Sequence, residues 1–466
     1  MHCTAIGKTF LIHNRQTEQD KWEKELEKFL KGQKFIVDIN AITSEGQAVA
    51  KIDDFVVFIN GGAPKDKAEI ILTKVSKNYA VGKIISLLNS SDLRVTPECP
   101  YFGICGGCQL QHISYDEQLK IKQNNVFEQI KRIGGIDCTD IIKNIVPSAP
   151  FYYRNKVQFV VEKQKLGLYS LNSHSFVNIK KCILQSDLSN KILESAEKIL
   201  NTKTYAKLNF LRHFSIRTSS LDEVCITIVS SKKSPLLKKF ASDLVKEFPE
   251  IKSVSININR ENTNVIYGKE SEIIFGDDSI CEKIFDKSIR INCESFFQVN
   301  YNSACEMVKT VKSFLPEKSD SVFLDSYCGS GFFSLFASDM FKKTVGIEEN
   351  KISISQALRN VKENNINNAE FVCSKMEDYV NSIDMSNVKY ALVDPPRKGL
   401  DISVIELLTS NDIDHIVYVS CNPATLARDL KIFSEKGFTP VNVQPIDMFP
   451  QTAHVETVVL MTRADA

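Results

Sequence analysis

The hydrophobic positions of this 466-residue chain change their period several times, and each change marks a boundary between kinds of structure. In the stretch EQDKWEKELEKFLKGQ, Trp22, Leu26 and Leu30 recur at four-residue spacing among charges. This spacing predicts a short amphipathic helix that ends at Gly32. From Lys34 onward, apolar and polar residues alternate between glycine-containing turns, which predicts several short strands and a small β-barrel.

The remaining chain shows two further patterns. A loop rich in cysteine and glycine leads into a helix that is predicted to begin near Ser114. From Phe151 to about Ile291, strand-like and helix-like stretches mix, which indicates an α+β domain. From Ser321 to the end, strands and helices alternate regularly. Regular alternation is typical of a doubly wound α/β sheet with mostly parallel strands.

Composition narrows the class of protein. The chain is 43% hydrophobic, which is enough to bury the cores of two to four domains. Its formal net charge is only +1, so any anionic partner must be met by local patches. The barrel lysines are candidates for contacts with phosphates, although they also fit ordinary solvated strand faces: Lys65, Lys67, Lys74, Lys77 and Lys83.

The chain shows neither a signal peptide pattern nor a long apolar segment, and this bears on the cellular compartment. No signal peptide pattern opens the chain, and no apolar run approaches ~18 residues. We therefore expect a soluble cytoplasmic protein with no membrane partner. Thiols stay reduced there, so clustered cysteines indicate metal binding or catalysis more than disulfide bonds.

The stretch FLDSYCGSGFFSLFA carries a glycine-rich turn between a strand and a helix. The strand ends at Asp325, and Gly329 and Gly331 follow, while the next strand ends at Glu348. Such a turn lets backbone approach a ligand closely, and an acid at the end of the next strand can bind ribose hydroxyls. Because the turn is not G-x-G-x-x-G, a nucleoside cofactor without a pyrophosphate fits best. S-adenosylmethionine is the expected cofactor.

Three more residues beside predicted strands are candidates for binding or catalysis. Asp394 begins DPPRKG, and Cys421 follows an apolar strand in YVSCNPATLARDL. Both strands are expected to end at the ligand-binding edge of the sheet. A thiolate there is a strong nucleophile. Glu456, in IDMFPQTAHVETVV, precedes the final strand, and a carboxylate near a thiol can act as a general base.

A separate cysteine set lies in CPYFGICGGC. Cys99, Cys105 and Cys108 have the spacing C-x5-C-x2-C, and Cys182 in NIKKCIL offers a fourth ligand. Four thiolates suit zinc or an iron–sulfur cluster, and the spacing does not choose between them.

Together, the motifs LDSYCGSGFFSL, DPPRKG and SCNPATLARDL resemble those of the S-adenosylmethionine-dependent RNA uracil-C5 methyltransferases, and the resemblance covers nearly the whole chain. It implies an α/β, Rossmann-like class I methyltransferase domain, an N-terminal OB-like TRAM barrel, and a mixed α+β central domain that carries a cysteine cluster. The implied boundaries are a helical extension at 1–32, a barrel at 33–92, a central domain at 93–110 and 143–285, and a catalytic domain at 111–142 and 286–466.

The resemblance also implies roles for single residues. Cys421 corresponds to the nucleophile and Glu456 to the proton acceptor, and Gln451 stands where the family more often has His. The residues that match the family's cofactor contacts are Gln298, Tyr327, Phe332, Glu348 and Asp394. The residues that match the ligands of a [4Fe–4S] cluster, as in the RlmD group of 23S ribosomal RNA methyltransferases, are Cys99, Cys105, Cys108 and Cys182.

The expected function is methyl transfer from S-adenosylmethionine to C5 of a uridine in structured RNA, through a covalent bond between Cys421 and C6 of the base. The cysteine set favours 23S ribosomal RNA, and transfer RNA stays open; a monomer is expected. The uridine must be flipped from its stack. Phe296 and Phe297 either stack on that base or belong to the core, and Arg397 is a candidate for holding a uracil carbonyl or a phosphate.

Three alternatives make different sequence predictions. Amino-group methyltransferases typically use Asn-Pro-Pro-aromatic where this chain has Asp-Pro-Pro-Arg. RNA cytosine-C5 methyltransferases place one cysteine in a Thr-Cys pair and another after a proline, and DPPR carries none. A non-catalytic RNA-binding iron–sulfur protein predicts a degraded glycine turn or no cysteine at position 421. The motifs favour the uracil-C5 enzyme over all three.

Overall fold

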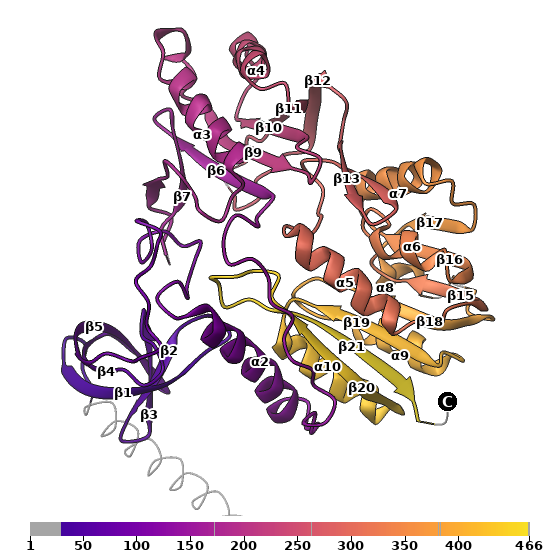
Figure 1. Ribbon diagram of the computed structural model, residues 1–466, viewed down its shortest axis with the longest axis horizontal. Helices are drawn as coiled ribbons and strands as arrows, with labels where there is room; N and C mark the ends of the chain where they lie inside the picture. Colours follow the sequence, from indigo (N-terminus) through magenta and orange to yellow (C-terminus); the bar gives the residue numbers. More distant parts are fainter. Residues whose placement is uncertain (1–28, 172, 262, 381, 383, 465–466) are drawn as a thin grey trace, which may run out of the picture. The chain divides into compact units, whose positions relative to one another are not determined.

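The structure is a computed structural model that describes residues 29–171, 173–261, 263–380, 382 and 384–464 (Figure 1). The chain divides into two compact units, Met1–Glu98 with Gln109–Ile121, and Cys99–Cys108 with Lys122–Ala466. The amphipathic helix predicted around Trp22 and Leu26 lies outside the described residues. Among the described helices, none is long and apolar enough to cross a membrane.

The first unit contains the closed barrel that the alternating pattern predicts. Its strands follow the order β1-β2-β3-β5-β4, and β4 pairs back with β1. Ala50, Val57 and Ile70 are fully buried inside it. A Cβ atom at Gly62 would stand 2.5 Å from Ile39 Cδ1, so only glycine fits there. The strands are β1 Lys34–Ile42, β2 Ala48–Ile52, β3 Phe55–Asn60, β4 Lys67–Val75 and β5 Tyr79–Asn89.

A buried carboxylate ties the barrel to the chain that follows it. Asp66 accepts hydrogen bonds from the backbone N–H groups of Ala63, at 2.7 Å, and Ser91, at 2.9 Å. Arg94 Nη2 lies 2.6 Å from the same carboxylate and also donates to the Gly61 carbonyl. A charge with this many donors is well compensated, so the segment after β5 is held firmly against the barrel.

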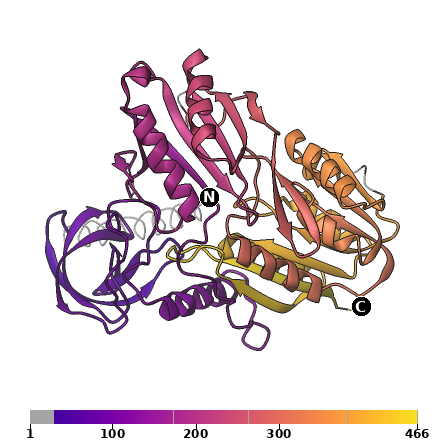
Figure 2. The same ribbon diagram turned by 45° about the horizontal axis from the view of Figure 1, so that its top comes forward.

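The second unit contains a seven-stranded central sheet in the order β12-β11-β10-β9-β6-β7-β8. Its helices α3 and α4 cover one apolar face, as Figures 1 and 2 show, and the core there includes Phe159, Phe214 and Phe240. The elements are β6 Lys156–Glu162, β7 Lys165–Tyr169, β8 Phe176–Asn178, α3 Asp187–Leu200, the 3-10 turn Lys203–Tyr205, β9 Leu211–Thr218, β10 Val224–Ser230, α4 Pro235–Glu247, β11 Ile251–Ile258 and β12 Glu270–Gly276.

The opposite face of the central sheet is polar. Arg217 on β9 pairs directly with Lys156 on β6 and with Cys225 on β10. Directly paired residues point to the same side of a sheet, so these three side chains share one face. The hairpin of β13 Ile280–Ile284 and β14 Lys287–Ile291 follows this sheet in the chain.

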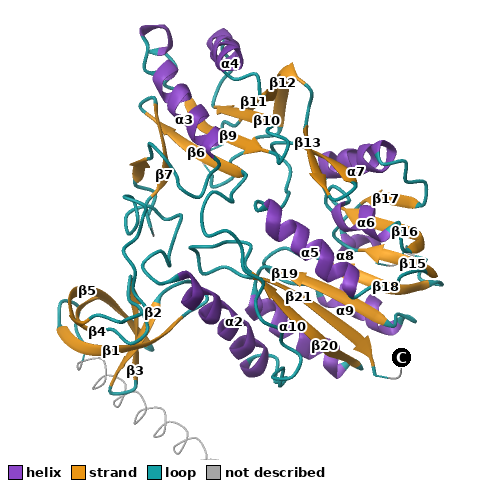
Figure 3. Ribbon diagram, viewed as in Figure 1, coloured by secondary structure: helices purple, strands orange, loops and turns teal. Residues whose placement is uncertain are grey.

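The C-terminal half forms a second seven-stranded sheet in the order β17-β16-β15-β18-β19-β21-β20. Figure 3 shows helices alternating with its strands, as the sequence predicts. The elements are α5 Tyr301–Ser313, β15 Ser319–Asp325, α6 Phe332–Ala337, β16 Phe341–Glu348, α7 Lys351–Glu363, β17 Ala369–Cys373, α8 Met376–Tyr379, β18 Val388–Val393, α9 Ile402–Ser410, β19 His415–Ser420, α10 Pro423–Glu435, β20 Phe438–Ile446 and β21 Glu456–Arg463. The helix predicted near Ser114 is α2, Tyr115–Arg132.

The strand order of this sheet reverses beside β15. Strands β16 and β17 lie on one side of β15, and β18 and β19 lie on the other, with all five parallel. In open α/β sheets, ligands bind outside the carboxyl ends of the strands at such a reversal. The crevice is therefore expected where β15, β18 and β19 end.

Candidate active site

Four predicted residues meet at the carboxyl edge of the second sheet. Asp325 ends β15, Asp394 follows β18, and Cys421 follows β19. Strand β21 runs antiparallel to β19, with Thr457 opposite Ser420. This last pair of the register brings Glu456, the first residue of β21, next to Cys421, although the two residues lie far apart in the chain.

Hydrogen bonds hold the two loops of this edge together. Asn422 caps α10 by accepting a hydrogen bond from the Ala424 N–H, while Pro423 occupies the first helical turn. The same Asn422 donates through Nδ2 to the Arg397 carbonyl at 3.0 Å, and Thr425 Oγ1 donates to it at 3.2 Å. The DPPR loop is thus fixed relative to Cys421.

A buried carboxylate on α10 completes this connection. Asp429 Oδ2 accepts hydrogen bonds from Tyr418 Oη, at 2.7 Å, and from the Leu400 N–H, at 2.9 Å. At Gly399, φ is +78°, and a Cβ atom would stand 2.6 Å from Asp429 Oδ2. The glycine in DPPRKG therefore allows the loop to approach the helix.

The environment raises the pKa values of the acidic groups at this edge. Burial raises the pKa of the Cys421 thiol to about 11, and the Glu456 carboxylate adds to the increase. The pKa of Glu456 is raised well above its usual range by burial and then by Asp394. Arg397 opposes both shifts. Burial, and then the charge of Asp325, raise the pKa of Asp394 to about 7. The site therefore places acid groups where their charged forms are costly, a common feature of catalytic sites.

The glycine turn offers acceptors and space for a cofactor. Asp325 Oδ2 accepts hydrogen bonds from the N–H and the hydroxyl of Ser334, but its buried Oδ1 has no partner among the described residues. Burial raises the pKa of Asp325 to about 7. Glu348 accepts from the N–H groups of Gly329 and Asn350, and a Cβ atom at Gly329 would meet nothing within 4 Å. Carboxylate acceptors beside open space fit a cofactor with a hydroxylated ribose.

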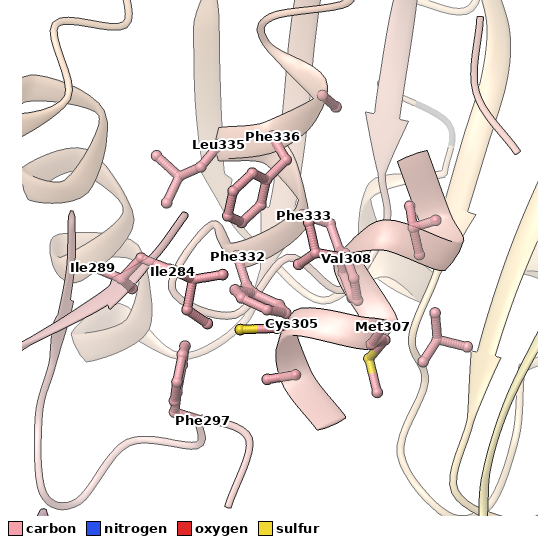
Figure 4. Packing of buried hydrophobic residues seen from close by; sticks show 14 of the residues in the cluster. Ile284, Ile289, Phe297, Cys305, Met307, Val308, Phe332, Phe333, Leu335 and Phe336 are labelled. Carbon is pink, nitrogen blue, oxygen red and sulfur yellow. The ribbon is translucent and has the colours of Figure 1, made fainter. Parts of the chain in front are cut away.

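The other predicted cofactor residues differ in exposure. Gln298 is buried, and Tyr327 is half-buried, with its pKa raised by burial and by Glu377. The Phe332 ring lies in the hydrophobic cluster of Figure 4, where it meets Phe297 edge-on at 5.4 Å between centroids. Phe297 is therefore a core residue, whereas Phe296 is 70% exposed. Of the two aromatic candidates for stacking on a base, only Phe296 is available.

A network that sequence reasoning did not identify holds the loop before Glu456. Lys122 Nζ of α2 lies 2.6 Å from Asp447 Oδ1, with both side chains fully buried, and also donates to the Phe449 carbonyl. Tyr153 Oη donates to the Pro450 carbonyl at 3.0 Å. Nothing in the local sequence marks Lys122, because its partner is 325 residues away. The loop is nonetheless anchored at several points.

The four predicted cluster cysteines lie in and near one irregular loop of the second unit. The Gly106 N–H donates to the Tyr169 carbonyl, and the Lys180 N–H donates to Tyr101 Oη, which brings the loop to the chain around Cys182. Burial, and then the charges of Cys182 and Cys99, raise the pKa of Cys105. However, the described part of the chain holds no group of three or more His, Cys, Asp or Glu side chains placed to bind a metal ion. None of the described cysteines forms a disulfide bond.

Two family models match the chain. The one described as tRNA (Uracil-5-)-methyltransferase matches residues 114–464, and the one described as TRAM domain matches residues 28–85. A Clostridium tetani protein described as an RNA methyltransferase is 36% identical over 438 residues, which is 91% of this chain and 95% of the relative. A Bacillus cereus protein with the same description is 34% identical over 438 residues, which is 91% of this chain and 95% of the relative.

One solved structure is similar over almost the whole chain. It is the Pyrococcus abyssi tRNA (uracil-54, C5)-methyltransferase in complex with S-adenosyl-L-homocysteine. Its TM-score is 0.74 and its sequence identity is 28%, and the match covers 92% of this chain and 99% of that one. The similarity therefore extends across both units.

Proposed function

The chain belongs to the tRNA (uracil-5-)-methyltransferase family, and from this we propose that it transfers a methyl group from S-adenosylmethionine to C5 of a uridine in RNA, with Cys421 bonded transiently to C6. The observation that carries the proposal is the proximity of Cys421 and Glu456 at the adjoining ends of β19 and β21, with Asp394 and Arg397 close enough to shift their pKa values. A nucleophile and a base facing one another at a ligand-binding edge suit this reaction.

The cofactor fits the glycine turn. Glu348 and Asp325 supply carboxylate oxygens, and the open space over Gly329 admits a ligand close to the backbone. The similar Pyrococcus abyssi structure holds S-adenosyl-L-homocysteine, which supports the same class of cofactor here. When bound, S-adenosylmethionine supplies an electrophilic methyl group. We assign Gln298, Tyr327, Phe332, Glu348 and Asp394 to its binding.

The protein must activate a carbon that is a poor nucleophile. Addition of the Cys421 sulfur to C6 of the uracil moves electron density to C5 as an enolate. Once C5 carries the new methyl group, its proton must leave so that the C6–S bond can break by β-elimination. Glu456 takes that proton. Burial raises the pKa of both groups, so Cys421 must lose its proton as the substrate binds, and Glu456 must be in its carboxylate form when it takes the C5 proton.

Arg397 is the cation that favours the charged forms of both groups. We propose that it also contacts a uracil carbonyl or a phosphate. Arg397→Ala is then expected to raise the KM for RNA. Unchanged RNA kinetics would remove Arg397 from the mechanism and leave the roles of Cys421 and Glu456 intact.

A methylation assay with anaerobically purified protein and labelled S-adenosylmethionine tests the proposal. Unmodified 23S ribosomal RNA and unmodified transfer RNA are supplied separately, and mass spectrometry identifies the product nucleosides. We expect 5-methyluridine that disappears in Cys421→Ala. Label in any other nucleoside would contradict the role of Cys421.

We propose 23S ribosomal RNA as the substrate because the cysteine set resembles that of the 23S enzymes. Transfer RNA is the second candidate, since the matching family description and the Pyrococcus abyssi structure both name tRNA enzymes. The same assay separates them: product in only one of the two RNAs identifies the substrate.

We also propose that Cys99, Cys105, Cys108 and Cys182 bind a [4Fe–4S] cluster. Each iron of such a cluster takes one thiolate, so its cysteines stand farther apart than the ligands of a single ion. Four half-buried thiols in and near one loop supply the four thiolates, although within the described residues no group of three or more His, Cys, Asp or Glu side chains is placed to bind a single metal ion. The chemistry of thiolate ligands also permits zinc.

Metal analysis decides this assignment. Anaerobically purified protein is expected to contain iron and acid-labile sulfide in equal amounts, and Cys182→Ala is expected to lose both. Cys373→Ala is the matched control, because Cys373 is exposed and lies on β17. Stoichiometric zinc without sulfide would overturn the cluster and keep the four ligands.

A further inference from the structure

The segment of residues 292–299 passes against the polar face of the central sheet on its way to α5. It contains Phe296, which is 70% exposed, between buried neighbours on both sides. The next residue, Phe297, packs its ring against Phe332 beside the glycine turn. A single exposed aromatic side chain is ordinary on a protein surface, but the buried residues on both sides of Phe296 restrict the direction in which it points.

Side chains of the central sheet fix this backbone at both ends. Arg217 Nη2 donates to the Ser295 carbonyl at 3.0 Å, and Lys156 Nζ donates to the same oxygen at 3.3 Å. At the other end, Asn155 donates through its backbone N–H to the Val299 carbonyl, at 2.8 Å, and through Nδ2 to the Gln298 carbonyl, at 3.1 Å. Two cations thus converge on the residue directly before Phe296.

Burying Arg217 lowers the stability of the fold, so a purely structural role does not explain it. It is 1% exposed, and its Nε and Nη1 have no hydrogen-bond partner among the described residues. A buried donor without a partner lowers stability, and a buried cation lowers it further. Replacing a buried charged group by an apolar side chain of similar volume is often neutral or stabilising. Stability alone therefore does not account for an arginine here.

Two buried thiols lie beside these cations. Cys225 pairs with Arg217 across the strands, and Cys293 Sγ lies 3.4 Å from the Cys225 carbonyl oxygen. A hydrogen bond with Cys225, and then the charges of Lys156 and Arg217, lower the pKa of Cys293 to about 7. The cations thus interact with the same segment twice, at Cys293 and at Ser295.

We propose that Arg217, assisted by Lys156, is a positioning residue for the RNA substrate. It holds the Ser295 carbonyl so that Phe296 stays exposed as a stacking surface for the flipped uridine, and so that Gln298 keeps its place. The inference rests on the proposed function. It adds a residue from the central domain, outside the motifs of the methyltransferase sheet, to the binding of substrate.

The test compares Arg217→Met with the matched control Arg212→Met. Arg212 lies on the same strand and also donates to carbonyl groups, but those belong to Asn259 and Glu261. For Arg217→Met we expect the KM for RNA to rise about tenfold. We expect an unchanged KM for S-adenosylmethionine and a Tm equal to or above that of the wild type. The control should leave the KM for RNA unchanged.

A double-mutant cycle with Phe296→Ala separates positioning from general damage. If Arg217 acts through Phe296, Arg217→Met should add little to the KM for RNA once Phe296 is removed. Additive effects, or a lower Tm with both KM values unchanged, would overturn the proposal. Should Arg217→Met fail to fold, Arg217→Lys, which keeps a donor, takes its place and is expected to raise the KM for RNA by less. If the wild-type protein methylates RNA and both Arg217 variants have the same KM for RNA as the wild type, only the positioning role is overturned. If the wild-type protein makes no 5-methyluridine, the proposed function itself is overturned.

Discussion

The second unit contains two candidate sites that are built in different ways. At the sheet edge, Asp325, Asp394 and Cys421 each follow a parallel strand, and Glu456 begins the antiparallel partner of β19. The cysteine set instead lies in and near an irregular loop outside any helix or strand. Its residues approach one another through a few backbone hydrogen bonds.

The difference shows what a bound group contributes to each site. A strand ladder positions its end residues with no ligand present, so the candidate catalytic groups are preorganised, and the cost of burying them appears in their raised pKa values. Loop cysteines have no such ladder. Where a metal group joins them, its binding free energy contributes to folding of the loop. We therefore expect perturbations of the two sites to have separable effects.

The largest expected effect comes from Glu456→Gln. The amide keeps the shape but cannot take the C5 proton, so the covalent RNA adduct of Cys421 should accumulate. Turnover should fall by roughly 10²–10⁴-fold. Denaturing gel electrophoresis with labelled RNA detects the adduct.

The matching control is Cys421→Ala combined with Glu456→Gln, which must form no adduct. Normal turnover of Glu456→Gln, with no trapped species, would show that another group takes the proton.

The next largest effect tests whether the cysteine loop can be perturbed without changing the sheet edge. Cys182→Ala should loosen the cysteine loop and speed its cleavage by a protease within residues 99–108, because the proposed cluster would no longer join the segments. Alkylation of Cys421 by iodoacetamide should keep its rate, since β19 and β21 hold that residue. Limited proteolysis and mass spectrometry measure both. A large change at Cys421 would mean that the two sites are coupled.

A smaller effect is expected from Asp429→Asn. The amide keeps one acceptor but loses the charge that Arg428 Nε and Tyr418 Oη bind in a buried position. We expect a loss of about 1–3 kcal/mol in the free energy of unfolding. Urea denaturation measures it. Asp401→Asn is the control, because Asp401 is an exposed helix cap; a similar loss there would show that burial of Asp429 is not the cause.

The smallest effect concerns pH. Since the pKa of Cys421 is about 11, its alkylation rate should keep rising with pH up to about that value. Asp394→Asn removes a neighbouring negative charge, so it should lower the pKa of Cys421 and speed alkylation at pH 8. Stopped reactions analysed by mass spectrometry give the profile. A slower reaction in Asp394→Asn would contradict the assigned sign.

Much of the architecture was predictable because it depends on local patterns. Alternation predicts the barrel, and the alternating strands and helices predict the second sheet, with Asp325, Asp394 and Cys421 at strand ends. The helix after the cysteine loop begins within one residue of the predicted Ser114. Polar residues that follow apolar strands were also a sufficient signal for the candidate site.

The structure separates residues that the sequence presents as equivalent. Phe296 and Phe297 are adjacent and identical in type, yet one is exposed and the other belongs to the core. Arg217 and Lys122 stand in ordinary-looking stretches, although both are fully buried and bind distant segments. No local pattern distinguishes them, because their partners are far away in the chain.

Local sequence accounts for the kinds of element and for the chemistry at their ends, because hydrophobic period and turn residues act over a few neighbours. Which strand ends lie side by side depends instead on how the sheets pack. Cys421 meets Glu456 because β21 inserts antiparallel beside β19, and Ser295 meets Arg217 because the segment before α5 crosses the central sheet. Such contacts depend on the packing of whole sheets, in which the burial of many side chains outweighs the preference of any single one.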